Sequence, residues 1–269
     1  MLTEIVSAHL QKLANDRKPT SSIGGWNCGD CKTKLWHALN GSPAEPMDGR
    51  AIFTFLMGDK VEDAVVEILQ GAGVPIIRTD EKRDTVEIPP VGRVRTDLWF
   101  QAGDRVLPCE VKSMSNFGFE RFERGEVDWQ HQCQAETYLR AYDAPVIPIF
   151  AVRKETSHYA EQVLRRDDSR WAWICANVEA ARATTCPQRP YQLKDECEGV
   201  AEGKCVNGRT PKSGQAHKAC AGTGRQPGGP FIPSWPCSYC SWKRVCWERD
   251  GGTLQIVLAE GEKPRWRLA

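Results

Sequence analysis

The chain of 269 residues has neither a long hydrophobic run nor an excess of charge of one sign. Its longest apolar stretch, residues 144–152, contains Pro145 and Pro148 and is far shorter than the ~20 apolar residues that span a bilayer, so we expect no membrane segment. No basic stretch followed by an apolar one opens the sequence, so we expect no secretory leader and a cytoplasmic location. With a net charge of +1, any nucleic-acid site must come from local basic patches.

Internal repeats are also absent, and apolar residues make up 41% of the chain, enough for a hydrophobic core. The twelve cysteines need an explanation. Without a leader, ligation of a metal or a cluster is a better interpretation than disulfide bonds. Cys109, Cys133 and Cys175 lie in apolar or helical patterns, where buried thiols are the simpler interpretation.

Hydrophobic periodicity and turn residues predict alternating helices and strands. Helices are predicted at residues 2–13, 31–39, 61–69, 117–124 and 128–142, with partly helical segments at 157–166 and 170–183. Strands are predicted at residues 74–78, 85–88, 91–100, 106–113, 145–153 and 254–258.

Composition divides the sequence into three parts. Residues 1–185 contain most of the predicted elements and are expected to form the core, with an N-terminal helical part. Residues 186–236 are rich in Gly, Pro and basic residues and are interpreted as an insertion or small subdomain. Residues 237–269 hold a short cysteine-rich segment and a tail.

Two carboxylates and a lysine are predicted to meet at the end of a hairpin. Asp97 lies near the end of one predicted strand, and Glu110 and Lys112 lie on the next. Side chains at positions i and i+2 of a strand share a face, so Glu110 and Lys112 face together and the hairpin can bring Asp97 beside them. Clustered carboxylates suit Mg²⁺ or Mn²⁺, and the lysine can position a water that attacks a phosphate. The alternative is a surface strand with cross-strand charges.

Three further polar residues are candidates for the same site. Glu62 lies early in a predicted helix and flanks its apolar stripe, although a solvated glutamate is an equally good interpretation. Gln134 and Tyr138 lie one helical turn apart on one face. A glutamine and a phenol can hold a phosphate or a base, and the alternative is an ordinary polar helix face.

A second cluster consists of cysteines from both ends of the chain. Cys237, Cys240 and Cys246 have the spacing Cys-x2-Cys-x5-Cys, which serves either zinc or an iron–sulfur cluster. A fourth ligand would come from Cys31 or Cys28, and Cys31 is favoured because it immediately precedes a helical pattern. The spacing alone does not separate the two cofactors.

The insertion contains its own set of ligand-type residues, namely Cys197, Cys205, His217 and Cys220. These four would complete a tetrahedral zinc site. A segment with so little apolar content needs such a site to be ordered. The alternative is a flexible basic loop with free cysteines.

Taken together, these motifs resemble the RecB-like PD-(D/E)XK nucleases, in the iron–sulfur branch that contains the CRISPR-associated single-strand exonucleases and their phage relatives. The chain also resembles the nuclease domains of bacterial helicase–nuclease complexes. The motifs follow the order of the family and cover most of the chain: Cys31 with Lys-x-Lys-Leu-Trp after it, Gly58-x3-Glu62, Asp97, Glu110-x-Lys112, Gln134-x3-Tyr138 and Cys237-x2-Cys240-x5-Cys246.

The resemblance implies an α/β fold of the restriction-endonuclease type, with a mixed central sheet flanked by helices. It also implies an iron–sulfur clasp that joins the N- and C-terminal segments, in which a [4Fe–4S] cluster is bound by Cys31, Cys237, Cys240 and Cys246. The insertion at residues 186–236 is not a general feature of the family.

For the catalytic site, the resemblance implies that Glu62, Asp97 and Glu110 bind Mg²⁺ or Mn²⁺, joined by the carbonyl of Val111. Thr96 stands where the proline that names the family would be, and Glu62 takes a place often held by histidine. The glutamate is expected to affect the metal preference.

The resemblance also implies that Lys112 acts on the attacking water, and that Gln134 and Tyr138 organise the site and the DNA strand. We therefore expect a metal-dependent DNA exonuclease that acts on single strands or duplex ends. The alternatives are a structure-specific endonuclease and a non-catalytic nucleic-acid-binding adaptor in a recombination or spacer-acquisition complex. The backbone of the DNA is expected to be guided by the basic insertion and by four cations: Arg121, Arg124, Lys243 and Arg244.

Overall fold

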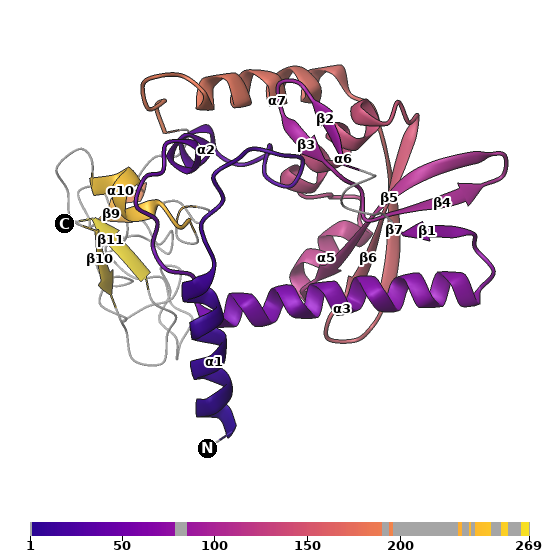
Figure 1. The fold of residues 1–269 in the computed structure, drawn as a ribbon, viewed down its shortest axis with the longest axis horizontal. Coiled ribbons are helices and arrows are strands. Elements are labelled where there is room, and N and C mark those ends of the chain that lie inside the picture. The colour runs from indigo at the N-terminus through magenta and orange to yellow at the C-terminus, as the bar shows by residue number, and fades with distance from the viewer. Residues whose placement is uncertain are drawn as a thin grey trace, which may run out of the picture. The chain divides into compact units, whose positions relative to one another are not determined.

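The computed structural model describes residues 2–78, 85–189, 194–195, 231–232, 237, 240–248, 254–257 and 265–268. The chain divides into two compact units (Figure 1). Unit 1 comprises residues 1–40 and 46–187, and unit 2 comprises residues 41–45 and 188–269.

Unit 1 contains a five-stranded sheet in the order β1-β4-β5-β6-β7. The strands are β1 (Ile76–Arg78), β4 (Leu98–Ala102), β5 (Arg105–Met114), β6 (Val146–Arg153) and β7 (Tyr159–Arg165). Strands β5 and β6 are parallel, and the other neighbouring strands are antiparallel. Parallel neighbours need a crossover connection, which here contains α5 (Asn116–Glu123) and α6 (Trp129–Ala141).

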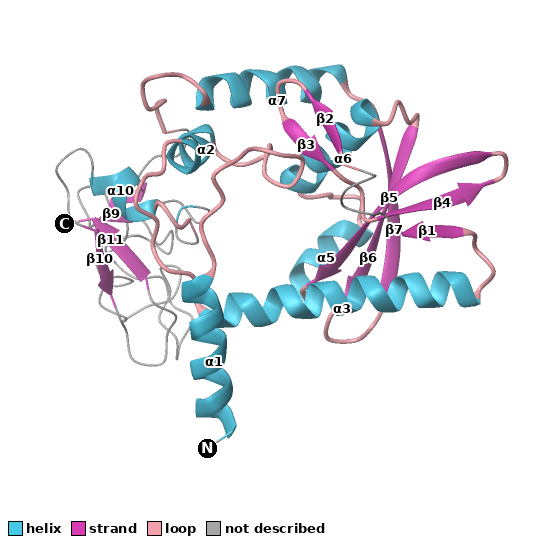
Figure 2. Cartoon of the chain, viewed as in Figure 1, coloured by secondary structure: helices cyan, strands magenta, loops and turns pink. Residues whose placement is uncertain are grey.

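Helices cover both faces of this sheet, as Figure 2 shows. On one face, Val65 and Val66 of α3 (Gly49–Gly71) pack with Leu98, Cys109 and Val111 of the sheet. On the other face, α5, α6 and α7 (Asp168–Ala181) enclose the larger core, whose buried members include Met114, Phe119, Leu139, Ile149, Ala151 and Ile174. A mixed sheet between helices fits the restriction-endonuclease-like fold expected from the sequence.

The remaining elements of unit 1 lie outside the main sheet. They are α1 (Leu2–Asp16), α2 (Lys32–Leu39) and the antiparallel pair β2 (Val86–Ile88) and β3 (Gly92–Val94). Asp128 caps the crossover helix α6 by accepting a hydrogen bond from the backbone N–H of Gln130, which stabilises its first turn.

Three predicted elements differ from the structure. The helix expected at residues 61–69 begins twelve residues earlier, at Gly49. The sequence pattern missed its first turns because they expose Phe53, Phe55 and Leu56 and show no apolar stripe. The strand expected at residues 91–100 is divided into β3 and β4. The partial helix expected at residues 157–166 is wrong.

The segment expected to be partly helical forms strand β7 at the edge of the sheet. Its residues alternate between exposed and half-buried along the strand, the period-2 pattern of a strand with one face on the core. Pairing with β6 over its full length satisfies the backbone on one side.

Unit 2 contains α10 (Lys243–Glu248) and a four-stranded sheet in the order β10-β11-β9-β8. Its strands are β8 (Lys194–Asp195), β9 (Phe231–Ile232), β10 (Leu254–Val257) and β11 (Arg265–Leu268). In the described residues of either unit, no helix has the length and apolar character needed to cross a membrane.

Candidate active site

The hairpin of β4 and β5 places Asp97 opposite Glu110. In this antiparallel pair Leu98 lies opposite Cys109, so the register puts the preceding residue, Asp97, opposite Glu110. Two hydrogen bonds hold this end of the hairpin. The backbone N–H of Val111 donates to Asp97 Oδ2 at 2.8 Å, and the buried hydroxyl of Thr96 donates to the carbonyl of Cys109 at 2.8 Å.

Glu110 is a buried carboxylate in an unfavourable environment. Its side chain is 3% exposed and forms an ion pair with Lys112 through Oε1. Burial and then the charge of Asp97 raise the pKa of Glu110 to about 8, although Lys112 opposes the shift. Among the described residues, the buried Oε2 atom of Glu110 has no hydrogen-bond partner. Such an atom is costly to leave unsatisfied and indicates a place for a cation.

The crossover helix α6 supplies the next two candidates. Gln134 Nε2 donates a hydrogen bond to the hydroxyl of Tyr138 at 2.7 Å, as their separation of one turn allows. Tyr138 is buried, and its pKa is raised by burial and then by the charges of Glu110 and Asp97. The phenol therefore lies beside the carboxylate pair.

Glu62 reaches the site from a different side. Helix α3 approaches β5 closely at Gly58, where an added Cβ would stand 3.8 Å from Ser113 Oγ. Glu62 follows one turn later. Burial disfavours the charged form of Lys112. This effect is outweighed by the negative charges of Glu110, Asp97 and then Glu62, so the pKa of Lys112 is raised.

The residues fit a divalent cation in part. Carboxylate oxygens are the ligands that Mg²⁺ and Mn²⁺ prefer. Asp97 and Glu110 bring such oxygens together, and one of them, Glu110 Oε2, has no hydrogen-bond partner among the described residues. Within the described ranges, however, no three His, Cys, Asp or Glu side chains form a group that could hold a metal ion. Asp97 and Glu110 alone leave coordination positions open, which water, substrate oxygens or the nearby Glu62 would fill.

The predicted cluster ligands belong to both units. Cys31 lies at the N-terminus of α2 in unit 1. In unit 2, successive turns carry the other three: the N–H of Cys240 donates to the carbonyl of Cys237 at 3.0 Å, and Cys246 follows in α10. Cys246 is buried, as are Trp242 and Trp247 on either side of it.

The expected zinc ligands lie outside the described residues, so their arrangement remains a prediction: Cys197, Cys205, His217 and Cys220.

The four cations expected to guide DNA all have acidic neighbours within their own unit. Arg121 and Arg124 both pair with Glu126. In unit 2, Lys243 and Arg244 both pair with Glu45. Their charge is therefore partly neutralised.

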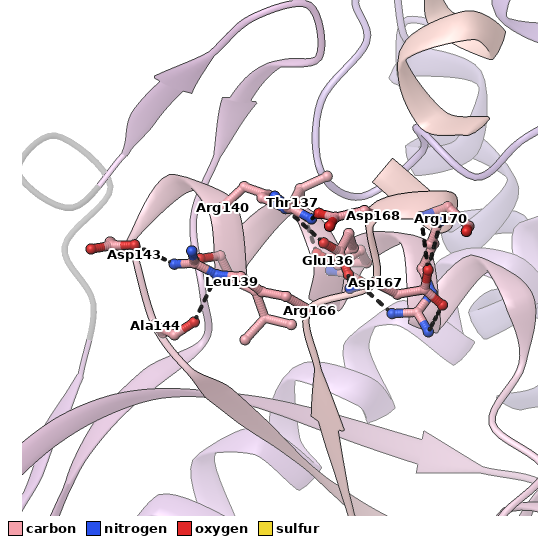
Figure 3. Close-up of polar contacts among 12 residues, drawn as sticks. Glu136, Thr137, Leu139, Arg140, Asp143, Ala144, Arg166, Asp167, Asp168 and Arg170 are labelled. Carbon is pink, nitrogen blue, oxygen red and sulfur yellow. Dashed lines mark hydrogen bonds and ion pairs between the residues drawn. The ribbon is translucent and has the colours of Figure 1, made fainter. Parts of the chain in front are cut away.

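A buried glutamate on α6 was not identified from the sequence. Glu136 is fully buried, and its two carboxylate oxygens accept hydrogen bonds from Arg140 at 2.8 Å and Arg170 at 3.1 Å. The backbone N–H of Asp167 also donates to it, at 2.9 Å. Figure 3 shows this network between α6 and the start of α7. The only sequence signal was the spacing of four between Glu136 and Arg140.

The network matters to the site because Glu136 lies between Gln134 and Tyr138 in the sequence. It ties their helix to α7 from the opposite side. Gly25 supports the same helix: an added Cβ there would stand 2.9 Å from Thr137 Oγ1 and 3.4 Å from the ring of Tyr138. Only a residue without a side chain fits there without movement of its neighbours.

Comparisons with known proteins give matches among solved structures only. No protein-family model matches the chain, and no curated protein matches it. One similar structure is that of the protein SSO0001, at 17% identity and a TM-score of 0.44, covering 67% of this chain and 85% of the other.

Another similar structure is an alkaline exonuclease (LHK-Exo) from Laribacter hongkongensis, at 14% identity and a TM-score of 0.41, covering 65% of this chain and 90% of the other. The same exonuclease in complex with dAMP matches at 12% identity and a TM-score of 0.41, covering 66% and 90%. Values this low carry no information about the activity of this chain.

Proposed function

We propose that the chain is a metal-dependent DNA nuclease that hydrolyses phosphodiester bonds, acting as an exonuclease on single strands or duplex ends. The observation that carries the proposal is the buried meeting of Asp97, Glu110 and Lys112, in which Glu110 Oε2 has no partner among the described residues. A purely structural ion pair would not need a second carboxylate beside the first, because that neighbour destabilises the charged form.

Each side chain has a role in the proposed reaction. Asp97 and Glu110 hold Mg²⁺ or Mn²⁺, with Glu62 and the carbonyl of Val111 as further candidate ligands. When bound, the cation polarises the scissile phosphate and lowers the pKa of a water. Lys112 orients the attacking water and offsets the negative charge that develops on the phosphate.

The helix α6 completes the proposed site. Tyr138 lies beside the carboxylates, and Gln134 fixes the direction of its hydroxyl by donating a hydrogen bond to it. Gln134, which is only half-buried, contacts the DNA strand without adding charge, and the buried Tyr138 holds Gln134 in place.

The decisive experiment is digestion of end-labelled single-stranded, duplex and circular single-stranded DNA with Mg²⁺, Mn²⁺ or a chelator. We expect linear DNA to be degraded only with metal, and the circle to stay intact. Cutting of the circle would favour a structure-specific endonuclease. No cutting of any substrate would contradict the proposal and favour the adaptor role.

Replacing Lys112 with alanine tests the assignment within the site. We expect Lys112→Ala to slow cleavage by about 100- to 1,000-fold, because a positioned charge that acts on the transition state is lost. Binding of single-stranded DNA, measured by fluorescence anisotropy in Ca²⁺, should change little. Lys154, exposed just beyond β6, provides a matched control: Lys154→Ala should cleave like the wild type. Equal losses of binding and cleavage would contradict the role given to Lys112.

The proposal includes a [4Fe–4S] cluster bound by Cys31, Cys237, Cys240 and Cys246. Three cysteines on successive turns beside buried tryptophans support it, since apolar cover limits the access of solvent to a cluster. Protein purified without oxygen should be brown and contain iron and acid-labile sulfide, and Cys246→Ser should lose both. A colourless protein that contains zinc would contradict the cluster. Zinc in residues 186–236 is a separate proposal, which metal analysis of the Cys220→Ser variant tests.

A further inference from the structure

His131 is a partly buried polar residue of α6 that has no role in the proposed mechanism. It precedes Gln134 by three residues and Tyr138 by seven, so the three side chains share one face of the helix. Its Nδ1 atom is buried and has no hydrogen-bond partner within the described part of the chain. A buried polar atom without a hydrogen-bond partner lowers the free energy of unfolding, and such an exception is often explained by a functional role.

The topology places His131 on the same side of Glu110 as Lys112. Helix α6 lies in the crossover between the parallel strands β5 and β6, so it runs back against the direction of β5. Earlier residues of α6 therefore lie beside later residues of β5. Tyr138 lies beside Glu110, and His131, seven residues earlier, lies about 10 Å back along the helix, toward the end of β5 that carries Lys112. Electrostatics agree, because burial and then the charge of Lys112 lower the pKa of His131 to about 4.

The two side chains are complementary but not bonded. A lysine ammonium has three N–H donors, and in the described residues the hydrogen bond of Lys112 goes to Glu110 Oε1. A neutral imidazole has one nitrogen that accepts. A cation bound by the oxygens of Glu110 would compete with Lys112 for them. The ammonium of Lys112 would then need another hydrogen-bond acceptor.

We infer that His131 is a positioning residue, whose Nδ1 atom accepts a hydrogen bond from Lys112 Nζ when Glu110 turns to the metal. His131 then keeps the ammonium aimed at the attacking water. The inference rests on the proposed function, because it needs a cation at Glu110. A direct role for His131 as a metal ligand is not favoured, since a group beside an ammonium lies on the side of the site where a second cation would be repelled.

Variants of His131 test the role in catalysis. We expect His131→Leu to lower kcat by about 10- to 100-fold with a change in KM of less than about threefold. His131→Asn should recover most of the loss, because its amide oxygen can take the place of Nδ1. With Lys112→Ala already present, adding His131→Leu should cost little more. The matched control is His9→Asn on the exposed side of α1, which should cleave like the wild type.

A spectroscopic measurement tests the contact without turnover. In histidine labelled with ¹⁵N, Mg²⁺ should move the Nδ1 resonance of His131 in the wild type but not in Lys112→Ala. If Mg²⁺ shifts signals elsewhere in the site while His131 stays silent, the inference fails and the proposed function stands. If Mg²⁺ moves no signal and the wild type cuts no DNA, both fail. A loss in His131→Leu that His131→Asn does not restore, or that adds fully to Lys112→Ala, also overturns the inference.

Discussion

Replacing Glu110 with glutamine should abolish cleavage and leave the metal-free protein at least as stable as the wild type. The loss of activity, about 1,000-fold or more, follows from the loss of a carboxylate in an electrostatic site. The stability follows from the environment of Glu110, whose side chain is 3% exposed and lies beside Asp97. A neutral amide of the same shape avoids the cost of burying that charge, and Lys112 keeps the neighbouring charge of Asp97.

The pH dependence of the free energy of unfolding tests whether the buried charge of Glu110 is what destabilises the wild type. The pKa of Glu110 is raised from 4.5 to about 8 in the folded state. Between these values the unfolded chain releases the proton more readily than the folded protein does, so a rise in pH lowers the free energy of unfolding. We expect this decline, on the order of a few kcal/mol, in wild type but not in Glu110→Gln. Below pH 4.5 Glu110 is protonated in both states, so its ionisation does not lower the free energy of unfolding. Above pH 8 it is ionised in both states, and the loss of stability stays constant.

Urea unfolding of both proteins across this pH range, without metal, measures the difference. Glu161→Gln is the matched control, because Glu161 is exposed on β7 and should affect neither activity nor the slope with pH. A Glu110→Gln variant that cleaves DNA, or one that is much less stable than wild type at pH 8, would contradict the proposed site. Adding Mg²⁺ should raise the unfolding midpoint of the wild type alone, since only it retains the ligand.

The second large effect is expected at Glu136, which should matter for stability. Glu136→Gln removes a fully buried charge and leaves Arg140 and Arg170 without their shared partner. Breaking a buried ion pair on one side costs about 3–5 kcal/mol. We expect a loss of this size in the free energy of unfolding, measured by urea titration with circular dichroism, and faster hydrogen exchange of the α6 amides.

Asp168 provides a matched control for Glu136. Its carboxylate pairs with the same Arg140 at 2.5 Å, but its side chain is 96% exposed. Asp168→Asn should therefore cost less than about 1 kcal/mol. Similar losses for Glu136→Gln and Asp168→Asn would show that burial does not determine the strength of this network. If Glu136→Gln keeps its stability, the network does not hold α6 in place.

Much of the site's local geometry was predictable because it depends on short-range order. The two-residue spacing of Glu110 and Lys112 puts them on one face of a strand, and a short turn at residues 103–104 sets the register that brings Asp97 opposite Glu110. The separation of Gln134 and Tyr138 by one turn likewise follows from helix geometry. These relations need only the correct local element.

Errors in the predicted fold arose where local patterns were weak. In residues 157–166 polar and apolar side chains come in pairs and do not alternate, so the local pattern does not indicate a strand. The strand is defined by its pairing with β6. The first half of α3 exposes apolar residues and has no stripe to mark it. In both cases the deciding interactions come from residues distant in the sequence.

The sequence by itself determined the chemical groups of this protein and their local spacing, because strand and helix periodicity depend only on neighbouring residues. The tertiary structure alone decided which groups share an environment. It brought Tyr138 and His131 across the crossover to Glu110 and Lys112, and it buried Glu136 between two arginines. The physical reason is that burial, and with it the pKa of a carboxylate, depends on which distant elements exclude water around it.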